Sequence, residues 1–330
     1  MNYFIKDFVN NAFKKTKDVN TELLSKKFEI AVSKLSDDEL CNLLIISGYI
    51  PDMYIHDSSE ETLYTKLCEV LEVVWAKRMG FKSNFVTQKS SYEDVVIYIN
   101  KSVIVSDTKT FRLGRSQAAP NVKDFVKPED YRKWLARYQD QTTNLGGLVV
   151  FPQLHEWSRG SDAHYYCSDK NNPIVMLPFH YLAYLLDSKN RLNYETSKLT
   201  LLWDYKKIFP NKVKDRICYW KTVNNQILHI TGDTISNFKS YLSKCEEQLY
   251  DYTMYIIQNL KNEKKEINDI ISSEIDKIED INELKNEYKK YKIIQEITKY
   301  DTVIERINKF RINTKSKETK YKSFIEKIFE

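Results

Sequence analysis

The chain has 330 residues, of which 42% are hydrophobic and 29% are charged. Seven glycines and seven prolines are too few for a low-complexity or collagen-like protein, and the apolar content suffices for a core. The formal charge is +5, from 51 basic and 46 acidic side chains. That excess excludes a histone-like polycation, so any nucleic-acid-binding face has to be local.

The cysteines and the N-terminus bear on the cellular compartment. Five cysteines are scattered along the chain without a C-x-x-C pair, which argues against a disulfide framework and a structural zinc site. The first residues contain no apolar run of signal-peptide length, and no stretch approaches the roughly 18 apolar residues of a membrane span. We therefore expect a soluble cytoplasmic protein with no membrane partner.

Helices are expected first in the chain. Residues 3–47 show apolar positions at three- and four-residue steps, which is typical of helices with one buried face. Ser36, followed three residues later by Glu39, predicts a capping box. A further helix is expected over residues 60–77, and Gly80 predicts its C-cap.

Four short apolar runs predict strands: 94–99, 103–105, 148–151 and 174–177. The first two form a hairpin with a turn at residues 100–102, and the last is apolar enough to lie inside a sheet. Gly146-Gly147 predicts a turn before the third strand. With a helix expected over residues 181–187, the order of elements predicts an α/β core behind a helical layer.

The end of the chain predicts helices only. Periodic apolar residues there form one expected stripe: Ile267, Ile271, Ile275, Ile278, Ile281, Leu284, Tyr288, Tyr291 and Ile294. We expect residues 1–235 to form an α/β domain with an N-terminal helical layer, which would carry any catalytic and DNA-recognition residues, and residues 236–330 to form a helical region. This region is expected as a solvated hairpin or coiled coil that packs on the core or forms a dimer arm. A DNA-clamping arm is the alternative.

Residues 93–115 carry the expected chemistry. Asp94 begins one strand of the predicted hairpin, Asp107 ends the other, and Lys109 follows two residues later. Residues two apart on a strand project to the same face, and Asp94 can reach that face across the hairpin. Two carboxylates suit Mg²⁺, which keeps several waters and binds substrate phosphate. A lysine beside them can orient or deprotonate a water or neutralise developing charge, so the set predicts phosphodiester hydrolysis.

A solvated cross-strand salt bridge between Asp107 and Lys109 is the alternative interpretation of the same spacing. The following segment favours a nuclease. From Lys109 to Arg137 there are eight basic and three acidic side chains, so this window carries a net charge of +5. Arg and Lys suit phosphates and guanine edges, while Asn and Gln suit adenine edges. A basic segment directly after the catalytic strand therefore predicts DNA binding.

Five side chains of this segment are expected to contact DNA: Arg112, Arg115, Asn121, Lys123 and Asp124. The arginines and the lysine can donate to guanine or phosphate, Asn121 can bond adenine bidentately, and Asp124 can accept from cytosine. A salt bridge with a neighbouring lysine is the alternative for Asp124, and a phosphate clamp is the alternative for Arg115.

Several runs of the sequence resemble one known family. They are Asp107–Arg115 (DTKTFRLGR), Asn121–Phe125, Asp94-Val95, Gly48–Pro51, Ser59–Lys66 and His180–Leu186. Together they resemble the HindIII-type type II restriction endonucleases within the PD-(D/E)xK nuclease superfamily. The resemblance covers roughly residues 40–190, and the last 140 residues match only as helical. It implies a restriction-endonuclease-like core with a mixed sheet flanked by helices.

The resemblance also implies roles for individual residues. Asp94 and Asp107 would be the metal ligands and Lys109 the catalytic lysine. Glu69 stands where related nucleases often carry an extra carboxylate, with a salt-bridged helix acid as its alternative. Where the family tends to have an acid before the first catalytic strand this chain has Thr87-Gln88, so the choice between one and two metals stays open.

The activity implied is that of a type II site-specific deoxyribonuclease. It would hydrolyse a short palindromic duplex site and leave 5′-phosphate ends, with Mg²⁺ as cofactor and Mn²⁺ as its substitute. Double-stranded DNA and a second copy in a homodimer are the implied partners. A cognate DNA methyltransferase is expected in the same cell without being a stable partner. The resemblance alone suggests AAGCTT as the site.

Two other functions are weighed against this one. A non-catalytic DNA-binding or helical scaffold protein would not need Asp107 or Lys109. A structure-selective nuclease of the same superfamily would cut according to DNA shape. The complete set of Asp94, Asp107 and Lys109 argues against the scaffold, and the basic segment argues less strongly against shape selection.

The remaining candidate residues do not form a recognisable catalytic or metal-binding motif. His155, His164 and His180 match no metal-ligand spacing and are expected as ordinary surface or core histidines. Cys167 is expected as a buried structural thiol. Glu93 is expected to point away from Asp94 and not to bind metal.

Overall fold

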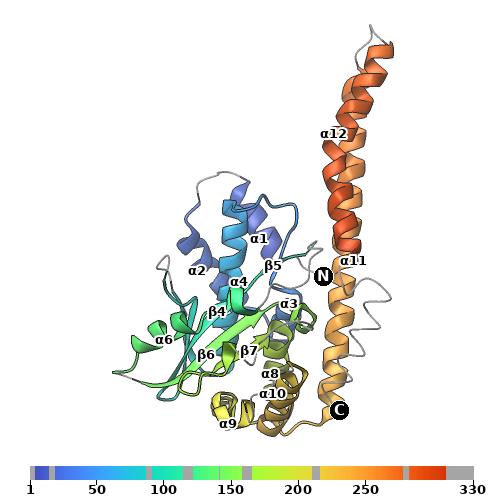
Figure 1. Ribbon diagram of the computed structural model, residues 1–330. Coiled ribbons are helices and arrows are strands. Elements are labelled where there is room, and N and C mark those ends of the chain that lie inside the picture. Colours follow the sequence, from blue (N-terminus) through green and yellow to red (C-terminus); the bar gives the residue numbers. More distant parts are fainter. Residues whose placement is uncertain are drawn as a thin grey trace.

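The computed structural model describes residues 4–14, 19–86, 91–113, 122–140, 142–157, 166–209, 216–277 and 282–309, with the backbone alone for residues 123 and 216–218. A five-stranded mixed sheet flanked by helices forms the centre, and a long helical hairpin projects from it (Figure 1). The expected α/β class and the helical end of the chain are therefore both present.

Four helices precede the central strands: α1 (Phe4–Phe13), α2 (Thr21–Val32), α3 (Asp37–Ile46) and α4 (Ser59–Arg78). The predicted capping box begins α3, because the Ser36 hydroxyl accepts from the Glu39 N–H and the Glu39 carboxylate accepts from the Ser36 N–H. Gly80 follows α4 with a φ of +90°, which confirms the predicted C-cap. Most of α4 is buried, so its acidic residues Glu69 and Glu72 lie inside the protein.

The central sheet has the order β2 (Lys82–Phe85), β3 (Val95–Ile99), β4 (Ser102–Thr108), β6 (Thr143–Phe151) and β7 (Ile174–Pro178). β2, β3 and β4 pair antiparallel, and β4, β6 and β7 pair parallel. The predicted hairpin of β3 and β4 is confirmed, with Asn100 in its turn at a φ of +55°. β1 (Tyr49–Ile50) pairs separately with β5 (Phe111–Arg112).

The predicted turn at Gly146-Gly147 is wrong, since both glycines lie inside β6. The packing of a helix against the sheet explains why residue 147 is a glycine. The ring of Tyr131, on helix α6 (Pro128–Ala136), lies so close that a Cβ on Gly147 would sit 2.3 Å from it. Glycine at this position thus makes room for a bulky side chain from the next layer.

The expected burial of residues 174–177 is confirmed, but their expected place in the interior of the sheet is not. Among the described strands β7 is an edge strand, although all its residues are buried. Helix α10 (Arg216–Thr231) supplies Tyr219, whose hydroxyl accepts from the Met176 N–H at 2.9 Å. A side chain therefore satisfies part of the exposed hydrogen-bonding edge. The polar strand β2 had no apolar signal and was not expected.

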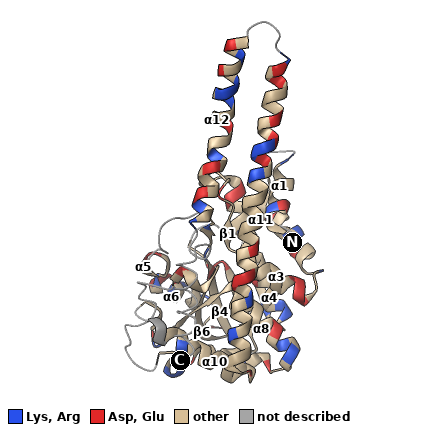
Figure 2. Cartoon of the chain, turned by 90° about the vertical axis from the view of Figure 1, so that its right-hand side faces the viewer, with Lys and Arg blue, Asp and Glu red and all other residues tan. Residues whose placement is uncertain are grey.

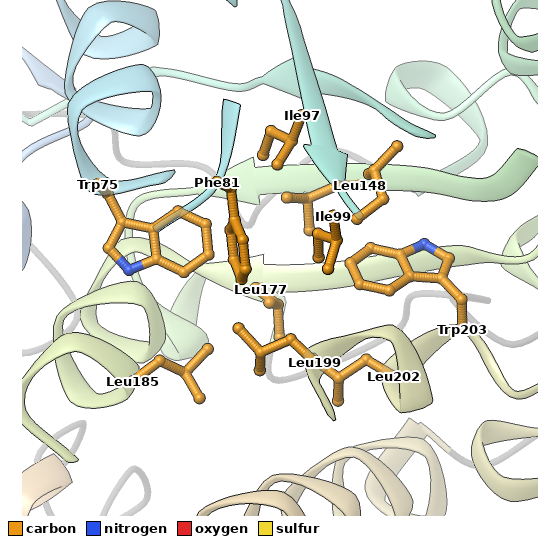
Figure 3. Close-up of a pocket in the computed structure, with 11 residues that line it drawn as sticks. Trp75, Phe81, Ile97, Ile99, Leu148, Leu177, Leu185, Leu199, Leu202 and Trp203 are labelled. Atoms are coloured by element: carbon orange, nitrogen blue, oxygen red, sulfur yellow. The ribbon is translucent and has the colours of Figure 1, made fainter. Parts of the chain in front are cut away.

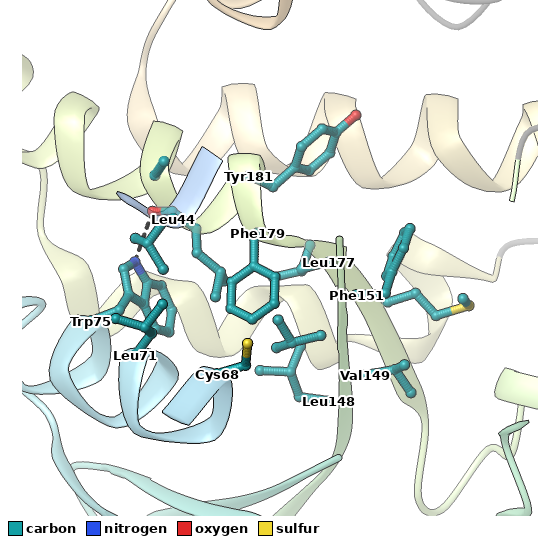
Figure 4. Packing of buried hydrophobic residues seen from close by; sticks show 14 of the residues in the cluster. Leu44, Cys68, Leu71, Trp75, Leu148, Val149, Phe151, Leu177, Phe179 and Tyr181 are labelled. Atoms are coloured by element: carbon teal, nitrogen blue, oxygen red, sulfur yellow. Dashed lines mark hydrogen bonds between the residues drawn. The ribbon is translucent and has the colours of Figure 1, made fainter. Parts of the chain in front are cut away.

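The apolar core joins α4 and helix α8 (Phe179–Leu192) to one face of the sheet. Phe179 lies between Cys68, Leu177 and neighbouring apolar groups, and the Trp75 indole donates to the Leu182 carbonyl at 2.8 Å (Figure 4). A small apolar cavity remains on this face. Trp75 and Trp203 lie at its opposite ends (Figure 3).

The remaining described elements are short or helical. They are α5 (Val122–Phe125), η1 (Leu154–Trp157), η2 (Thr196–Trp203), α9 (Tyr205–Ile208), α11 (Ile235–Asp276) and α12 (Asn282–Asn308). The first part of α11 packs on α3 and α8. Beyond the core, α11 and α12 form the projecting hairpin, on which basic and acidic side chains are mixed (Figure 2). Within the described residues, no helix is long and apolar enough to span a membrane.

The apolar stripe expected over residues 267–294 is divided in the structure. Ile275 is buried, while Leu284, Tyr288, Tyr291 and Ile294 of α12 are exposed. Residues 278 and 281 lie outside the described part of the chain. A second set of α12 side chains is buried instead, which includes Tyr300, Val303 and Ile307. The helical hairpin is confirmed, but its buried stripe is not the expected one.

Candidate active site

The end of β4 brings Asp107 and Lys109 together. The Lys109 ammonium lies 2.6 Å from Asp107 Oδ2, and the Lys109 N–H donates to the Val150 carbonyl at 2.7 Å. The backbone of β6 therefore fixes the chain directly after β4. The ion pair that was considered as an alternative does form. It does not exclude catalysis, because both side chains are only partly exposed and their charges act on the neighbouring Asp94.

Asp94 lies next to this pair at the start of β3. Its N–H donates to the Ser106 carbonyl at 2.9 Å, and its Oδ2 accepts from the Thr108 N–H at 2.9 Å. Burial, and then the negative charge of Asp107, raise the pKa of Asp94 to about 7, while the Thr108 N–H and two lysines oppose this change. Two buried carboxylates are thus close enough for their charges to repel, an arrangement that a cation stabilises.

Glu69 reaches the same region from α4. Its carboxylate pairs with Lys66 at 2.5 Å, and Lys66 also donates to the Val86 carbonyl at 3.1 Å. Burial and the nearby Asp94 raise the pKa of Glu69 well above its usual range. Lys66, Glu69 and Asp94 line one cleft of about 1060 Å³. The structure therefore places the suggested extra acid beside the predicted ligands, already paired with a lysine.

Two side chains that the sequence analysis did not select hold the end of β4 from opposite faces. On the α4 side, Glu72 Oε2 accepts from the Thr108 hydroxyl at 2.8 Å. On the α6 side, the Tyr131 hydroxyl donates to Asp107 Oδ2 at 3.3 Å. Burial raises the pKa of Glu72 to about 8. An acid within the apolar stripe of a helix was the available signal for Glu72, whereas Tyr131 looked like any core aromatic.

The donors fit a hard divalent cation held largely by water and substrate. Among the described residues, no group of three or more His, Cys, Asp or Glu side chains could hold a metal by itself. Asp94 and Asp107 supply two neighbouring carboxylates, and Mg²⁺ is commonly bound through one or two carboxylates plus waters and phosphate oxygens. The residues present therefore suit Mg²⁺ better than a metal that needs a complete protein cage.

Sequence comparison adds to this geometry. A model of the HindIII restriction endonuclease family matches residues 5–315. The chain belongs to this family. It is also similar to the type II restriction enzyme HindIII of Haemophilus influenzae (strain ATCC 51907 / DSM 11121 / KW20 / Rd), with 24% identity over 306 residues, which cover 90% of this chain and 87% of the relative. The chain is a type II restriction endonuclease, so the scaffold alternative is wrong.

The residues expected to contact DNA in this HindIII-family enzyme are only partly described. Asp124 is exposed on α5. Arg112 is used inside the protein, where its guanidinium donates to the Tyr54 carbonyl at 2.8 Å and to Glu61 at 2.6 Å. Arg115, Asn121 and the side chain of Lys123 lie outside the described part, as do Thr87-Gln88. The contact of these five residues with DNA therefore stays a prediction.

The other candidates are buried or outside the described residues, and Glu93 lines the same cleft as Asp94. Glu93 is buried, where Arg137 donates to it at 2.9 Å and the Tyr138 hydroxyl also donates to it. His155 and His180 are buried near each other, and burial lowers the pKa of His180 to about 3. Burial raises the pKa of the Cys167 thiol, as suits an unreactive core cysteine. His164 is outside the described residues.

Proposed function

We propose that the chain cuts a short palindromic DNA site as a homodimer in a Mg²⁺-dependent reaction. The observation that supports this most is the meeting of Asp94, Asp107 and Lys109 at the adjacent ends of β3 and β4 in a chain of the HindIII family. Each subunit would cut one strand, because a two-fold dimer matches the two-fold symmetry of a palindrome. AAGCTT remains the suggested site.

In this proposal Asp94 and Asp107 hold Mg²⁺, and Glu69 is available as a further oxygen donor. When bound, the cation makes a water more acidic and stabilises negative charge on the phosphate. Lys109 orients or deprotonates the attacking water, or neutralises charge that develops on the phosphate. Attack on phosphorus with departure of the 3′ oxygen leaves a 5′-phosphate end. Glu72 and Tyr131 keep the end of β4 in place during these steps.

Readout of the site is assigned to the segment after β5. Arg115, Asn121, Lys123 and Asp124 carry donors and acceptors for base edges, and Arg112 supports the segment through its bonds to the core. Each good bidentate base contact is worth about 1–3 kcal/mol, so loss of one should reduce discrimination by roughly tenfold or more. A cognate methyltransferase that protects the same site in the cell belongs to this proposal.

Digestion of a plasmid of known sequence tests the function. Purified enzyme with Mg²⁺ should produce discrete fragments whose ends share one sequence and carry 5′-phosphates. Cutting at bends or junctions of unrelated sequence would favour the structure-selective alternative. Asp107→Asn should be inactive, while Asp251→Asn, at an exposed position of α11, should cut normally. Equal activity of the two variants would contradict the assignment of Asp107.

Cation dependence is a second test of the same site. Cleavage should require Mg²⁺ or Mn²⁺ and stop in excess EDTA. Ca²⁺ should permit DNA binding without turnover, because it occupies oxygen sites with looser geometry. Full cutting in EDTA would show that the carboxylates act without a metal.

A further inference from the structure

The chain enters β3 through a residue in an unusual backbone conformation. Ser91 has a φ of +71°, in the left-handed region that residues with a Cβ seldom adopt. It lies three positions before Asp94, and Tyr92, Glu93 and Asp94 all line the cleft of about 1060 Å³. Strained residues persist where their surroundings hold them, so the contacts of Ser91 indicate what fixes this wall of the cleft.

Two side chains from the C-terminal end of α6 hold Ser91. The Trp134 indole donates to the Ser91 carbonyl at 3.0 Å, and the Arg137 guanidinium donates to the same carbonyl at 2.7 Å. Arg137 also stacks on the ring of Tyr92, with its guanidinium carbon 3.7 Å from the ring centre. We call Trp134 and Arg137, together with the Ser91 carbonyl that both contact, the Ser91 clamp.

Arg137 extends this hold to the residue beside Asp94. One nitrogen of its guanidinium donates to the Ser91 carbonyl, and another donates to the buried Glu93 carboxylate at 2.9 Å. The guanidinium is a rigid planar fork, so the positions of both acceptors are fixed relative to each other. A side chain that belongs to the basic segment of the sequence is therefore used within the protein.

Asp94 needs such support because it lies at the end of a strand beside another carboxylate. Its N–H donates to the Ser106 carbonyl directly before β3 begins, and strand ends open more readily than strand centres. The negative charge of Asp107 also opposes that of Asp94 in the metal-free protein. Tyr131 of α6 already donates to Asp107 at 3.3 Å. One helix therefore contacts both segments that carry the proposed metal ligands.

We infer that Arg137 is a positioning residue of the active site, which acts through the Ser91 clamp and Glu93 to keep Asp94 close enough to Asp107 for both to hold one divalent cation. The inference rests on the proposed role of Asp94 as a metal ligand. It assigns to Arg137 an effect on the affinity for the cation, whereas an arginine that contacts a phosphate would change the affinity for DNA.

Hydrogen exchange of the metal-free, full-length enzyme tests the clamp without any measurement of activity. In Arg137→Gln the amides of residues 91–96 should exchange about tenfold faster or more, because hydrogen bonds from a charged group are lost. Exchange in α8, on the other side of the core, should match that of the wild type. Equal exchange of residues 91–96 in both proteins would overturn the inference, and so would faster exchange throughout the core.

Cation dependence separates positioning from DNA contact. Arg137→Gln should raise the Mg²⁺ concentration for half-maximal single-turnover cleavage by about tenfold, with a rate at saturating Mg²⁺ within a few-fold of wild type. Arg137→Lys should lie between the two, since lysine keeps the charge but lacks the planar fork. Affinity for duplex DNA in EDTA should be equal in all three proteins. Weaker DNA binding with a normal Mg²⁺ requirement would make Arg137 a DNA contact and overturn the inference.

Two control variants should keep the wild-type Mg²⁺ requirement. Lys101→Gln removes a positive charge from the exposed turn of the same hairpin, and Tyr138→Phe removes the other donor to Glu93 while both bonds to Ser91 remain. An equal rise in Tyr138→Phe would assign the effect to Glu93 and overturn the role of the Ser91 clamp.

Asp94→Asn shows whether the inference or the proposed function has failed. An inactive Asp94→Asn beside an Arg137→Gln enzyme with a normal Mg²⁺ requirement would overturn the clamp alone. An Asp94→Asn enzyme that cuts at the wild-type rate would overturn the proposed metal site and the role of Arg137 with it.

Discussion

The end of β4 and the projecting hairpin differ in how their polar groups are held. At β4 the carboxylates of Glu72 and Asp107 are bonded to side chains 36 and 24 positions away in the sequence, inside the protein. On the hairpin, charged pairs such as Lys299–Glu296 join exposed neighbours at 3.7 Å. The hydrogen bonds of buried polar groups depend on the packing of several helices and strands at once. Exposed ion pairs contribute little to the free energy of unfolding and affect only their own part of a helix. Function and stability should therefore respond to substitution very differently in the two regions.

The largest effect is expected where the end of β4 performs the chemistry. Lys109→Ala should lower the rate of DNA cleavage by roughly three orders of magnitude or more, since it removes the group that assists the water or the transition state. Single-turnover cleavage with Mg²⁺ measures this, and a gel-shift assay in Ca²⁺ should show DNA binding retained. A rate within a few-fold of wild type would place catalysis elsewhere.

A pH effect on stability should be next in size. In the metal-free enzyme the pKa of Glu72 is raised from 4.5 to about 8, so between these values the folded state holds a proton that the unfolded chain has released. Stability should accordingly fall as pH rises through this window, by up to about 1.4 kcal/mol for each pH unit. Asp94, with a pKa raised to about 7, acts in the same direction.

Glu72→Gln isolates this effect, because glutamine is neutral in both states. Urea unfolding in EDTA between pH 5 and 8 should show a flatter dependence for Glu72→Gln than for wild type. Glu283→Gln, at an exposed position of α12, should leave the slope unchanged. Parallel curves for all three proteins would show that Glu72 is not buried in its neutral form.

A smaller effect on the cleavage rate is expected from removal of the Tyr131 hydroxyl, with Tyr138, close to it in sequence, as the control. Tyr131→Phe removes the donor to Asp107 and should lower the cleavage rate by about tenfold and raise the Mg²⁺ concentration needed, since a hydrogen bond to a charged group is worth about 1.5–3 kcal/mol at most. Tyr138→Phe is the control, because its hydroxyl donates to Glu93, a residue that the proposal does not use as a metal ligand. An equal change in both variants would indicate a general loss of structure.

The smallest effect should come from the hairpin. Lys264→Ala removes the ion pair between Lys264 of α11 and Asp301 of α12, which measures 2.5 Å and is partly exposed to solvent. Thermal unfolding should show a loss of about 0.5 kcal/mol or less, with cleavage unchanged. A loss of several kcal/mol would mean that the hairpin is as tightly coupled as the sheet.

The parts of the fold that could be predicted from sequence depend on local signals. Side chains alternate between the two faces of a strand, and this alternation predicted that Asp107 and Lys109 lie on the same face. Ser36 and Gly80 are residue types typical of helix ends, and they predicted the start of α3 and the end of α4. Glu72 and Tyr131 were not predicted because their roles depend on which layer packs over β4. Gly147 was assigned to a turn for the same reason, since the Tyr131 ring that requires it comes from another element. Exposure of Tyr288 and Tyr291 depends on which face of α12 turns toward α11, which the apolar periodicity of the sequence did not specify.

The length of α11 has a mechanical consequence. Its 42 residues form one helix of about 63 Å, whose first turns are fixed by Phe238 and Leu242 against the core. A tilt of one degree at these turns moves the far end by about 1 Å. A small change in how α11 packs on α3 and α8 would therefore move the far end of the helix by about 1 Å for each degree of tilt. Labels at the two ends of α11 would consequently report strain in the core as a change in distance.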